Sequence, residues 1–217
     1  LFLLDKVIKS GFLKIDIKLK FDDNGSIEDN YQIRGFIKNS NINFFNHYNA
    51  KKLNFEFDIG KKKYSITKIK TNLNGINLFS SLIDIVEKEK LFFVKGKIES
   101  TEKDFNKEEL NNFFNDFLNN LDTEQVNFSS VNNFSFNINK KLKINNLSIK
   151  SEIKLNQFVV KNNFIDLKSY LPKADNILNF KKHKILIDYK KDKLEVNGEG
   201  KILIKNNSDF IKYKIFK

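Results

Sequence analysis

The sequence predicts a mainly β protein: a twisted antiparallel sheet of many strands, curled into an elongated groove, with one amphipathic helix. Three features indicate this fold. Apolar and polar residues alternate over most of the chain, turn signals separate the alternating segments, and glycine recurs inside them, as at Gly35, Gly96 and Gly198. Alternation is typical of a strand with one apolar face, and a glycine in mid-strand indicates a bend or a close approach by another group.

The first half, residues 1–100, contains the alternating segments 12–21, 31–37, 53–59, 64–73 and 91–100. The connections between them are too short for parallel crossovers, so the strands are expected to be antiparallel. The segment Asp22–Ser26 contains Asn-Gly and predicts a hairpin turn. It is like a calcium loop only superficially, because the downstream carboxylate ligands of such a loop are missing.

Two segments depart from the alternation. In residues 78–86 the apolar residues have helical spacing, but the segment is short, and an irregular strand is the alternative. Residues 106–121 predict an amphipathic helix, with Asn106 and Glu109 spaced as a capping pair. Its apolar stripe consists of Leu110, Phe113, Phe114, Phe117, Leu118 and Leu121. We expect this stripe to cover the sheet, since a helix that lies on a membrane would carry more positive charge.

The second half, residues 128–217, returns to alternation, which leaves residues 101–127 as a helical connection. The alternation slips at Asn145 and Asn146, which predicts a bulge or a tight turn. The single proline, Pro172, marks an irregular crossing before a final meander of strands. We expect the two halves to form one continuous sheet.

Composition narrows the possible functions. The net charge of +12 would suit an anionic partner, but there is a single arginine, and the lysines alternate along strands instead of clustering. This distribution favours a solvated surface. The absence of cysteine excludes disulfides and thiolate chemistry, and the two histidines, His47 and His183, have no second histidine at ligand spacing. With no catalytic motif and no metal-ligand pattern, we expect neither an enzyme nor a cofactor.

The predicted strands create a problem of burial. Each strand turns an apolar face the same way, and one helix is too little to cover them all. The sheet therefore folds onto itself as a dry sandwich, closes as a barrel, or forms a groove for an apolar ligand. The candidate residues that line such a groove are Ile33, Ile37, Phe55, Phe57, Phe92, Val94, Ile98, Phe134, Phe136, Ile138, Ile149, Ile153, Leu155, Ile185, Ile187 and Val196.

A similar residue pattern recurs in several of the predicted strands. It is found in YQIRGFIKNSNI and FFVKGKIES, which flank LNFEFDI and KKKYSITKIK. It continues in FSFNINKKLKINNLSIKSEIKL, in the YLP crossing and in KILIDYKKDKLEVNGEGKILI before IKYKI. In this residue pattern the chain resembles the AsmA-like proteins of Gram-negative envelopes, including the TamB and YhdP types. Its composition is typical of an organism with AT-rich codons. The resemblance covers most of the chain but rests on no invariant motif.

This resemblance implies a periplasmic body, an inner-membrane anchor and a β-groove that carries phospholipids between the inner and outer membranes. No catalytic residues are carried over. Because the sequence lacks methionine, we expect it to be part of a longer chain that holds the anchor elsewhere. We therefore predict a monomeric lipid-conduit segment that binds phospholipid or another acyl lipid and no nucleic acid. The alternatives are a structural or adhesive β-sandwich with a dry core and a module that binds polyanions.

Overall fold

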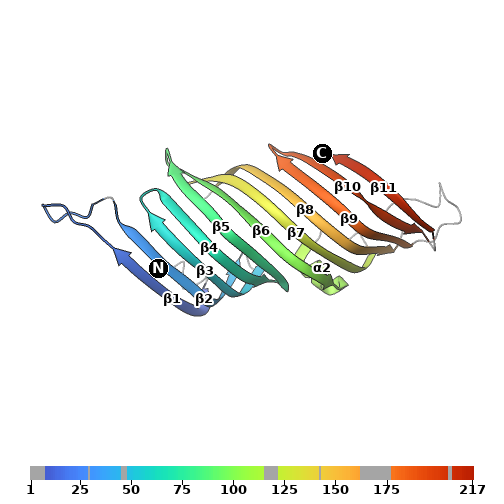
Figure 1. Ribbon diagram of the computed structural model, residues 1–217, viewed down its shortest axis with the longest axis horizontal. Coiled ribbons are helices and arrows are strands. Elements are labelled where there is room, and N and C mark those ends of the chain that lie inside the picture. Colours follow the sequence, from blue (N-terminus) through green and yellow to red (C-terminus); the bar gives the residue numbers. More distant parts are fainter. Residues whose placement is uncertain are drawn as a thin grey trace. The chain divides into compact units, whose positions relative to one another are not determined.

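A computed structural model describes residues 8–28, 30–44, 48–114, 122–141, 143–161, 177–204 and 207–217. Nearly all of them are strand (Figure 1). The strands are β1 (Ile8–Lys18), β2 (Gln32–Phe44), β3 (Tyr48–Gly60), β4 (Lys63–Leu73), β5 (Ile76–Lys88), β6 (Leu91–Phe105), β7 (Asp122–Asn139), β8 (Ile144–Lys161), β9 (Ile177–Lys190), β10 (Lys193–Ile204) and β11 (Asn207–Phe216). The helix is α2 (Lys107–Phe114).

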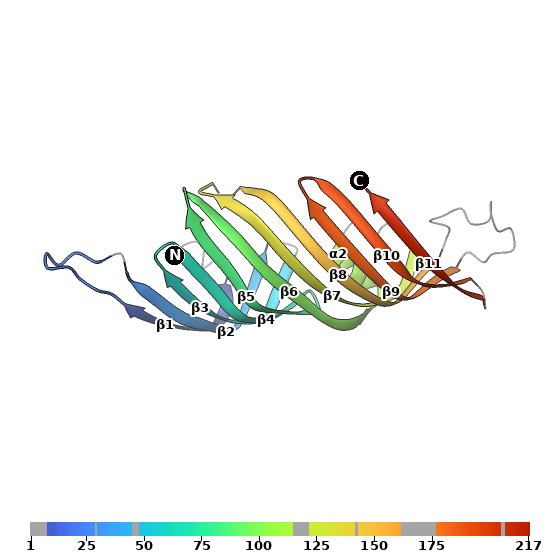
Figure 2. The same ribbon diagram turned by 45° about the horizontal axis from the view of Figure 1, so that its top comes forward.

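Strands that follow one another in the chain are neighbours in the sheet, in the order β1 to β11. The registers between β1 and β5 and between β9 and β11 are antiparallel, as the short connections require (Figure 2). The prediction of a mainly β protein with a twisted antiparallel sheet is thereby confirmed.

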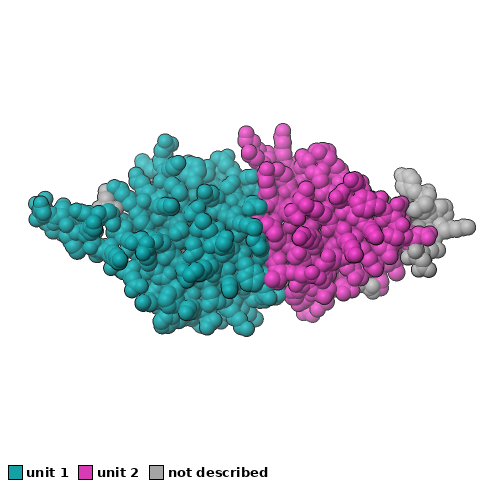
Figure 3. All heavy atoms as spheres, in the orientation of Figure 1, with its two compact units in different colours: residues 1–99, 133–149 teal, residues 100–132, 150–217 magenta. Residues whose placement is uncertain are grey.

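The chain divides into two compact units (Figure 3). Unit 1 comprises residues 1–99 and 133–149, and unit 2 comprises residues 100–132 and 150–217. Strands β6, β7 and β8 contribute residues to both. The expected division at Ser100 and Phe128 stays a prediction.

Mid-strand glycines allow aromatic rings to lie against the backbone of the neighbouring strand. In unit 1, Gly35 pairs directly with Phe57, and a Cβ atom added at Gly35 would lie 2.5 Å from Cζ of that ring. At Gly96, the added atom would lie 2.7 Å from Cζ of Phe134. No side chain larger than hydrogen fits beneath these rings, which explains why glycine recurs inside strands that otherwise favour β-branched residues.

Cross-strand ion pairs connect the charged side chains of neighbouring strands. In unit 1, Arg34 Nε lies 2.7 Å from Asp58 Oδ2, and Lys68 Nζ lies 2.8 Å from Glu56 Oε1. Burial raises the pKa of Asp58, but hydrogen bonds from Arg34 and Gln32 outweigh it and hold that pKa below its ordinary value. Alternating lysines are thus partners of carboxylates across the strands, which is the arrangement of a solvated sheet face.

Irregularities mark the places where the sequence pattern slips. Asn146 has a φ of 54°, in the left-handed region, which fits the bulge or tight turn predicted there. In β5, Ser80 is buried, Leu82 is exposed and Ile85 lies on the apolar face, so the alternation shifts by one residue. This shift produces the helical spacing of residues 78–86, and the irregular strand is the correct alternative.

The hairpin turn at Asp22–Ser26 is confirmed. Oδ1 of Asp22 accepts hydrogen bonds from the backbone N–H groups of Asn24 at 3.0 Å and Ser26 at 2.8 Å. Gly25 has a φ of 78°, and Phe21 and Ile27 form an antiparallel bridge at the base of the turn. The carboxylate therefore stabilises the turn through local backbone donors, as aspartate does in such turns.

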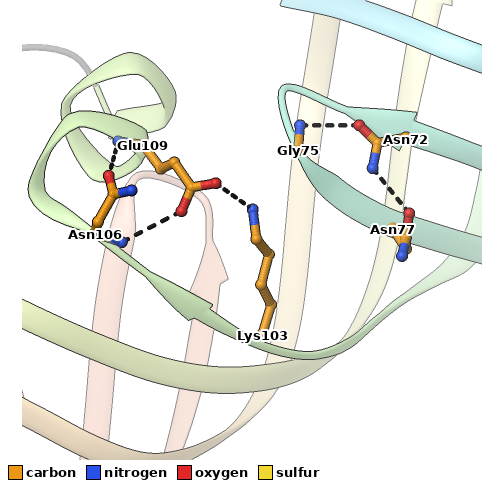
Figure 4. Close-up of polar contacts among 6 residues, drawn as sticks. All are labelled: Asn72, Gly75, Asn77, Lys103, Asn106 and Glu109. Atoms are coloured by element: carbon orange, nitrogen blue, oxygen red, sulfur yellow. Dashed lines mark hydrogen bonds and ion pairs between the residues drawn. The ribbon is translucent and has the colours of Figure 1, made fainter.

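Helix α2 belongs to unit 2 and begins with the predicted capping pair (Figure 4). Oδ1 of Asn106 accepts from the N–H of Glu109 at 2.9 Å, and Oε2 of Glu109 accepts from the N–H of Asn106 at 3.3 Å. Lys103 Nζ lies 2.7 Å from the other carboxylate oxygen. Leu110, the first residue of the predicted apolar stripe, is 1 % exposed. Residues 115–121 and the side chain of Phe113 lie outside the described part, so the expected lid stays a prediction.

The neighbouring strands reach further into the predicted connection than expected. Strand β6 continues to Phe105, and β7 begins at Asp122. Phe105 stacks on Phe128 with ring centroids 4.9 Å apart, and both Phe105 and Val126 are buried in unit 2. Apolar residues at both ends of the connection therefore extend the sheet instead of the helix.

Candidate apolar cavity of unit 1

Cross-strand register collects apolar side chains on one face of unit 1. One row of paired residues contains Ile17, Ile33, Ile59, Tyr64 and Ile85, from β1 to β5. The next row contains Ile15, Gly35, Phe57, Ile66 and Ile83. Residues opposite one another in adjacent strands place their side chains on the same face, so alternation in each strand becomes a continuous apolar surface.

This surface forms an open cavity of about 650 Å³. The volume lies within the range of about 300–1,000 Å³ that is usual for small-molecule sites. The residues that line it are Leu13, Ile15, Ile33, Ile37, Phe55, Phe57, Ile59, Tyr64, Ser65, Ile66, Ile85, Phe92, Val94 and Ile138. Only Tyr64 and Ser65 among them carry a hydroxyl group. The cavity therefore offers almost no hydrogen-bonding side chain to an occupant.

The lining remains partly open to solvent. Most of its residues are half-buried, and Leu13 and Ile15 on the edge strand β1 are exposed. Val94 is the exception, with 6 % exposure. A face of this composition that is left half-covered is unusual on a protein that has no ligand for it.

The two ends of the cavity differ. At one end Phe55 both lines the cavity and packs on a buried cluster formed by Ile42, Ala50 and Leu53. At the other end Ile59 and Tyr64 flank the turn between β3 and β4. Burial raises the pKa of Tyr64, and the neighbouring Glu87 and Tyr31 raise it further. The lining is therefore apolar beside the buried cluster and includes the Tyr64 hydroxyl group next to the turn.

The structure brings together seven of the predicted lining residues: Ile33, Ile37, Phe55, Phe57, Phe92, Val94 and Ile138. Four others belong to unit 1 without lining the cavity: Ile98, Phe134, Phe136 and Ile149. Phe134 instead lies over Gly96 and contacts Phe136, with ring centroids 5.9 Å apart. The remaining five lie in unit 2: Ile153, Leu155, Ile185, Ile187 and Val196.

Sequence reasoning missed part of the lining, although some signals were present. Ile59 follows Phe57 by two residues and therefore shares its face. Ile15 belongs to a clean alternation but is placed at the cavity only by its pairing with Gly35. Ile85 was not assigned to the apolar face, because the alternation of β5 shifts by one residue before it. Registers across strands, which no single strand reveals, were the missing information.

The described part of the chain holds no group of three or more histidine, aspartate or glutamate side chains that is arranged to bind a metal ion. Among the described helices, none has the length and apolar character needed to cross a bilayer. No protein-family model, curated protein or solved structure matches this chain.

Proposed function

We propose that this chain is a non-enzymatic segment of a lipid conduit, in which the cavity of unit 1 holds the acyl chains of phospholipids. In this proposal the whole protein carries lipid through the periplasm between the inner and outer membranes and is anchored in the inner membrane by a segment outside this sequence. The anchoring and the compartment follow the resemblance to AsmA-like proteins. The cavity supports the proposed binding of acyl chains.

The observation that carries the proposal is the open, almost wholly apolar cavity of about 650 Å³. An occupant gains free energy from burial alone, at about 25 cal/mol per Å² of apolar surface. Covering about 200 Å² of an acyl chain would thus contribute on the order of 5 kcal/mol. Since such contacts have no preferred direction, the chain can slide along the surface without breaking specific bonds, as a conduit requires.

Native mass spectrometry of the gently purified chain tests this function. We expect adducts whose masses, after extraction, are those of phospholipids. Ile66→Asp places a carboxylate in the cavity and is expected to remove the adducts, whereas Leu82→Asp, at an exposed position of the neighbouring strand β5, is expected to keep them. Absence of lipid from the parent protein, together with failure to bind added lysophospholipid, would overturn the proposal and favour the dry-core module.

A further inference from the structure

The turns at one end of unit 1 are rich in lysine. Because consecutive strands are antiparallel, the β3–β4, β5–β6 and β7–β8 turns all lie at the same end of the strands. These turns and the residues next to them contain eight exposed lysines: Lys61, Lys62, Lys63, Lys88, Lys90, Lys140, Lys141 and Lys143. Against them stand only Glu87 and Glu89. The charge of these three turns is therefore strongly positive.

The opposite end of the same strands is different. The β4–β5 turn consists of Asn74 and Gly75, and no charged residue lies between Asn72 and Asn77. Asn72 accepts from the N–H of Gly75 at 2.9 Å and donates to Asn77 at 2.8 Å (Figure 4). This turn is satisfied by its own amides and carries no charge for a ligand.

The lysine-bearing turns adjoin the cavity directly. Ile59 and Tyr64 flank the β3–β4 turn, and Ile138 immediately precedes the β7–β8 turn. That last turn is ordered by Asn139, whose Oδ1 accepts from the N–H groups of Lys141 at 2.9 Å and Lys143 at 3.0 Å. A polar group that leaves the cavity at this end meets lysines, whereas at the other end Phe55 packs on the buried cluster around Leu53.

The lysine-rich turns extend from β3 to β8 and do not include the β1–β2 connection. The β1–β2 connection lies at the same end of the strands, but it carries Asp22, Asp23 and Glu28. Within the described part of the chain, Lys62, Lys90 and Lys140 form no ion pair. Their charge is thus available to an anion over the stretch from β3 to β8.

We infer that the lysine-bearing turns of unit 1 bind the anionic head group of an amphiphile whose acyl chain occupies the cavity, with the chain end directed toward Phe55. This inference rests on the proposed function and adds to it the orientation of the ligand and its charge. The ligand class is an acyl amphiphile with a phosphate or carboxylate head group. Lysine ammonium groups suit such a head group as mobile point charges that do not demand one fixed geometry.

The preference for charge is tested by calorimetric titration with dodecyl phosphate and with neutral dodecyl maltoside, both below their micelle concentrations. We expect dodecyl phosphate to bind about tenfold more tightly at low salt, since three exposed charges each contribute a fraction of a kcal/mol. The preference should fall as salt is added. The triple variant Lys62→Gln, Lys90→Gln, Lys140→Gln should lose it while retaining its affinity for dodecyl maltoside.

A matched control removes the same charge elsewhere in unit 1. Lys51→Gln, Lys52→Gln, Lys70→Gln changes three exposed lysines on the other half of β3 and β4 and should keep the preference. Equal loss in both triple variants would overturn the inference, because the effect would then be one of net charge. Equal binding of both amphiphiles by the parent protein would overturn it too and leave the proposed function standing. Binding of neither amphiphile would overturn both.

The orientation is tested with stearate that carries a nitroxide quencher at carbon 5 or at carbon 16. The chain has no tryptophan, so Tyr64→Trp and Phe55→Trp each introduce a single reporter, one near the turns and one near the buried cluster. We expect the carbon-5 label to quench the reporter at position 64 more strongly and the carbon-16 label to quench the one at position 55. The reverse order, or no difference between the labels at either position, would contradict the inferred orientation.

Discussion

In both units an aromatic ring lies over a mid-strand glycine, but the surroundings of that ring differ. In unit 1, Phe57 lies over Gly35 beside a half-open apolar cavity. In unit 2, rings lie over Gly198 and Gly200, and they belong to Tyr213 and His183. A ring over a glycine thus lies beside an open apolar cavity in unit 1, whereas in unit 2 the rings over the glycines pack on one another.

The rings of unit 2 form a filled cluster. His183 is 2 % exposed, its Nε2 lies 2.9 Å from the carbonyl oxygen of Lys201, and its ring centroid lies 5.9 Å from that of Tyr213. Burial raises the pKa of the Tyr213 hydroxyl. The two cavities described in unit 2 each include several charged lining residues, among them Lys190 in one and Lys212 in the other. The proposed binding of acyl chains is therefore expected in the cavity of unit 1.

The largest expected effect is a difference in the free energy of unfolding between substitutions at a buried and at a half-buried position of unit 1. Val94→Asp would bury an unpaired carboxylate and should lower the free energy of unfolding by about 4 kcal/mol. Ile66→Asp, at a half-buried position of the same cavity, should cost only about 1–2 kcal/mol, because water reaches the carboxylate. Urea denaturation measures both. Equal losses would mean that the cavity is as closed as an ordinary core.

The next effect concerns the glycine of unit 1. In Gly35→Ala the new Cβ would meet the ring of Phe57 and also the backbone carbonyl oxygen of Lys14, at 2.1 Å. We expect a loss of about 3 kcal/mol, at the upper end of the usual range for overpacking. Truncating the ring in Phe57→Ala should not rescue the variant, because the backbone clash remains. A double-mutant cycle that shows full rescue would contradict this account.

In unit 2 the corresponding cycle should give the opposite result. The atoms nearest to a Cβ added at Gly198 all belong to the Tyr213 ring, at 2.1–2.3 Å. Gly198→Ala should therefore cost about 2 kcal/mol in the parent protein and less than about 0.5 kcal/mol in the Tyr213→Ala background. Additive losses in thermal or urea unfolding would show that the backbone of β10, and not the ring, sets the need for glycine.

The smallest expected effect lies at α2, which belongs to unit 2. A hydrogen bond from Lys103 lowers the pKa of Glu109, and a backbone hydrogen bond from Asn106 lowers it further, although burial raises it. The charged carboxylate therefore stabilises the fold above its ordinary pKa near 4.5, and this stabilisation disappears as the pH falls through the lower folded-state pKa. Glu109→Gln keeps the capping geometry and removes the charge. Its loss, below about 1 kcal/mol at neutral pH, should vanish in acid; a loss independent of pH would contradict the assignment.

Much of the fold follows from local patterns. Alternation identifies most of the strands, the Asn-Gly turn near Gly25 is found where its chemistry indicates, and the Asn106–Glu109 pair begins the helix. Each of these depends on residues that are close in sequence. The strand around Leu82 was ambiguous because a shift of one residue gives strand residues the spacing of a helix.

The cavity was only half predictable for a different reason. Parity shows that Phe57 and Phe134 share the apolar side of their strands, and each ring lies over a glycine, but parity does not show that of these two only Phe57 lines the cavity. Nor does it distinguish Ile153 in unit 2 from Ile138 in unit 1. Registers and ring positions depend on neighbouring strands, and these long-range relations are absent from any one segment.

The central claim is that unit 1 and not unit 2 holds the acyl chain. The most direct measurement is photocrosslinking of the full chain with a diazirine-bearing fatty acid, followed by peptide mapping. We expect label on the peptides that contain Phe55, Ile66 and Phe92, competed away by unlabelled phospholipid, and little on β9 to β11. Label concentrated on β9 to β11, or spread evenly over both units and insensitive to competitor, would contradict the account.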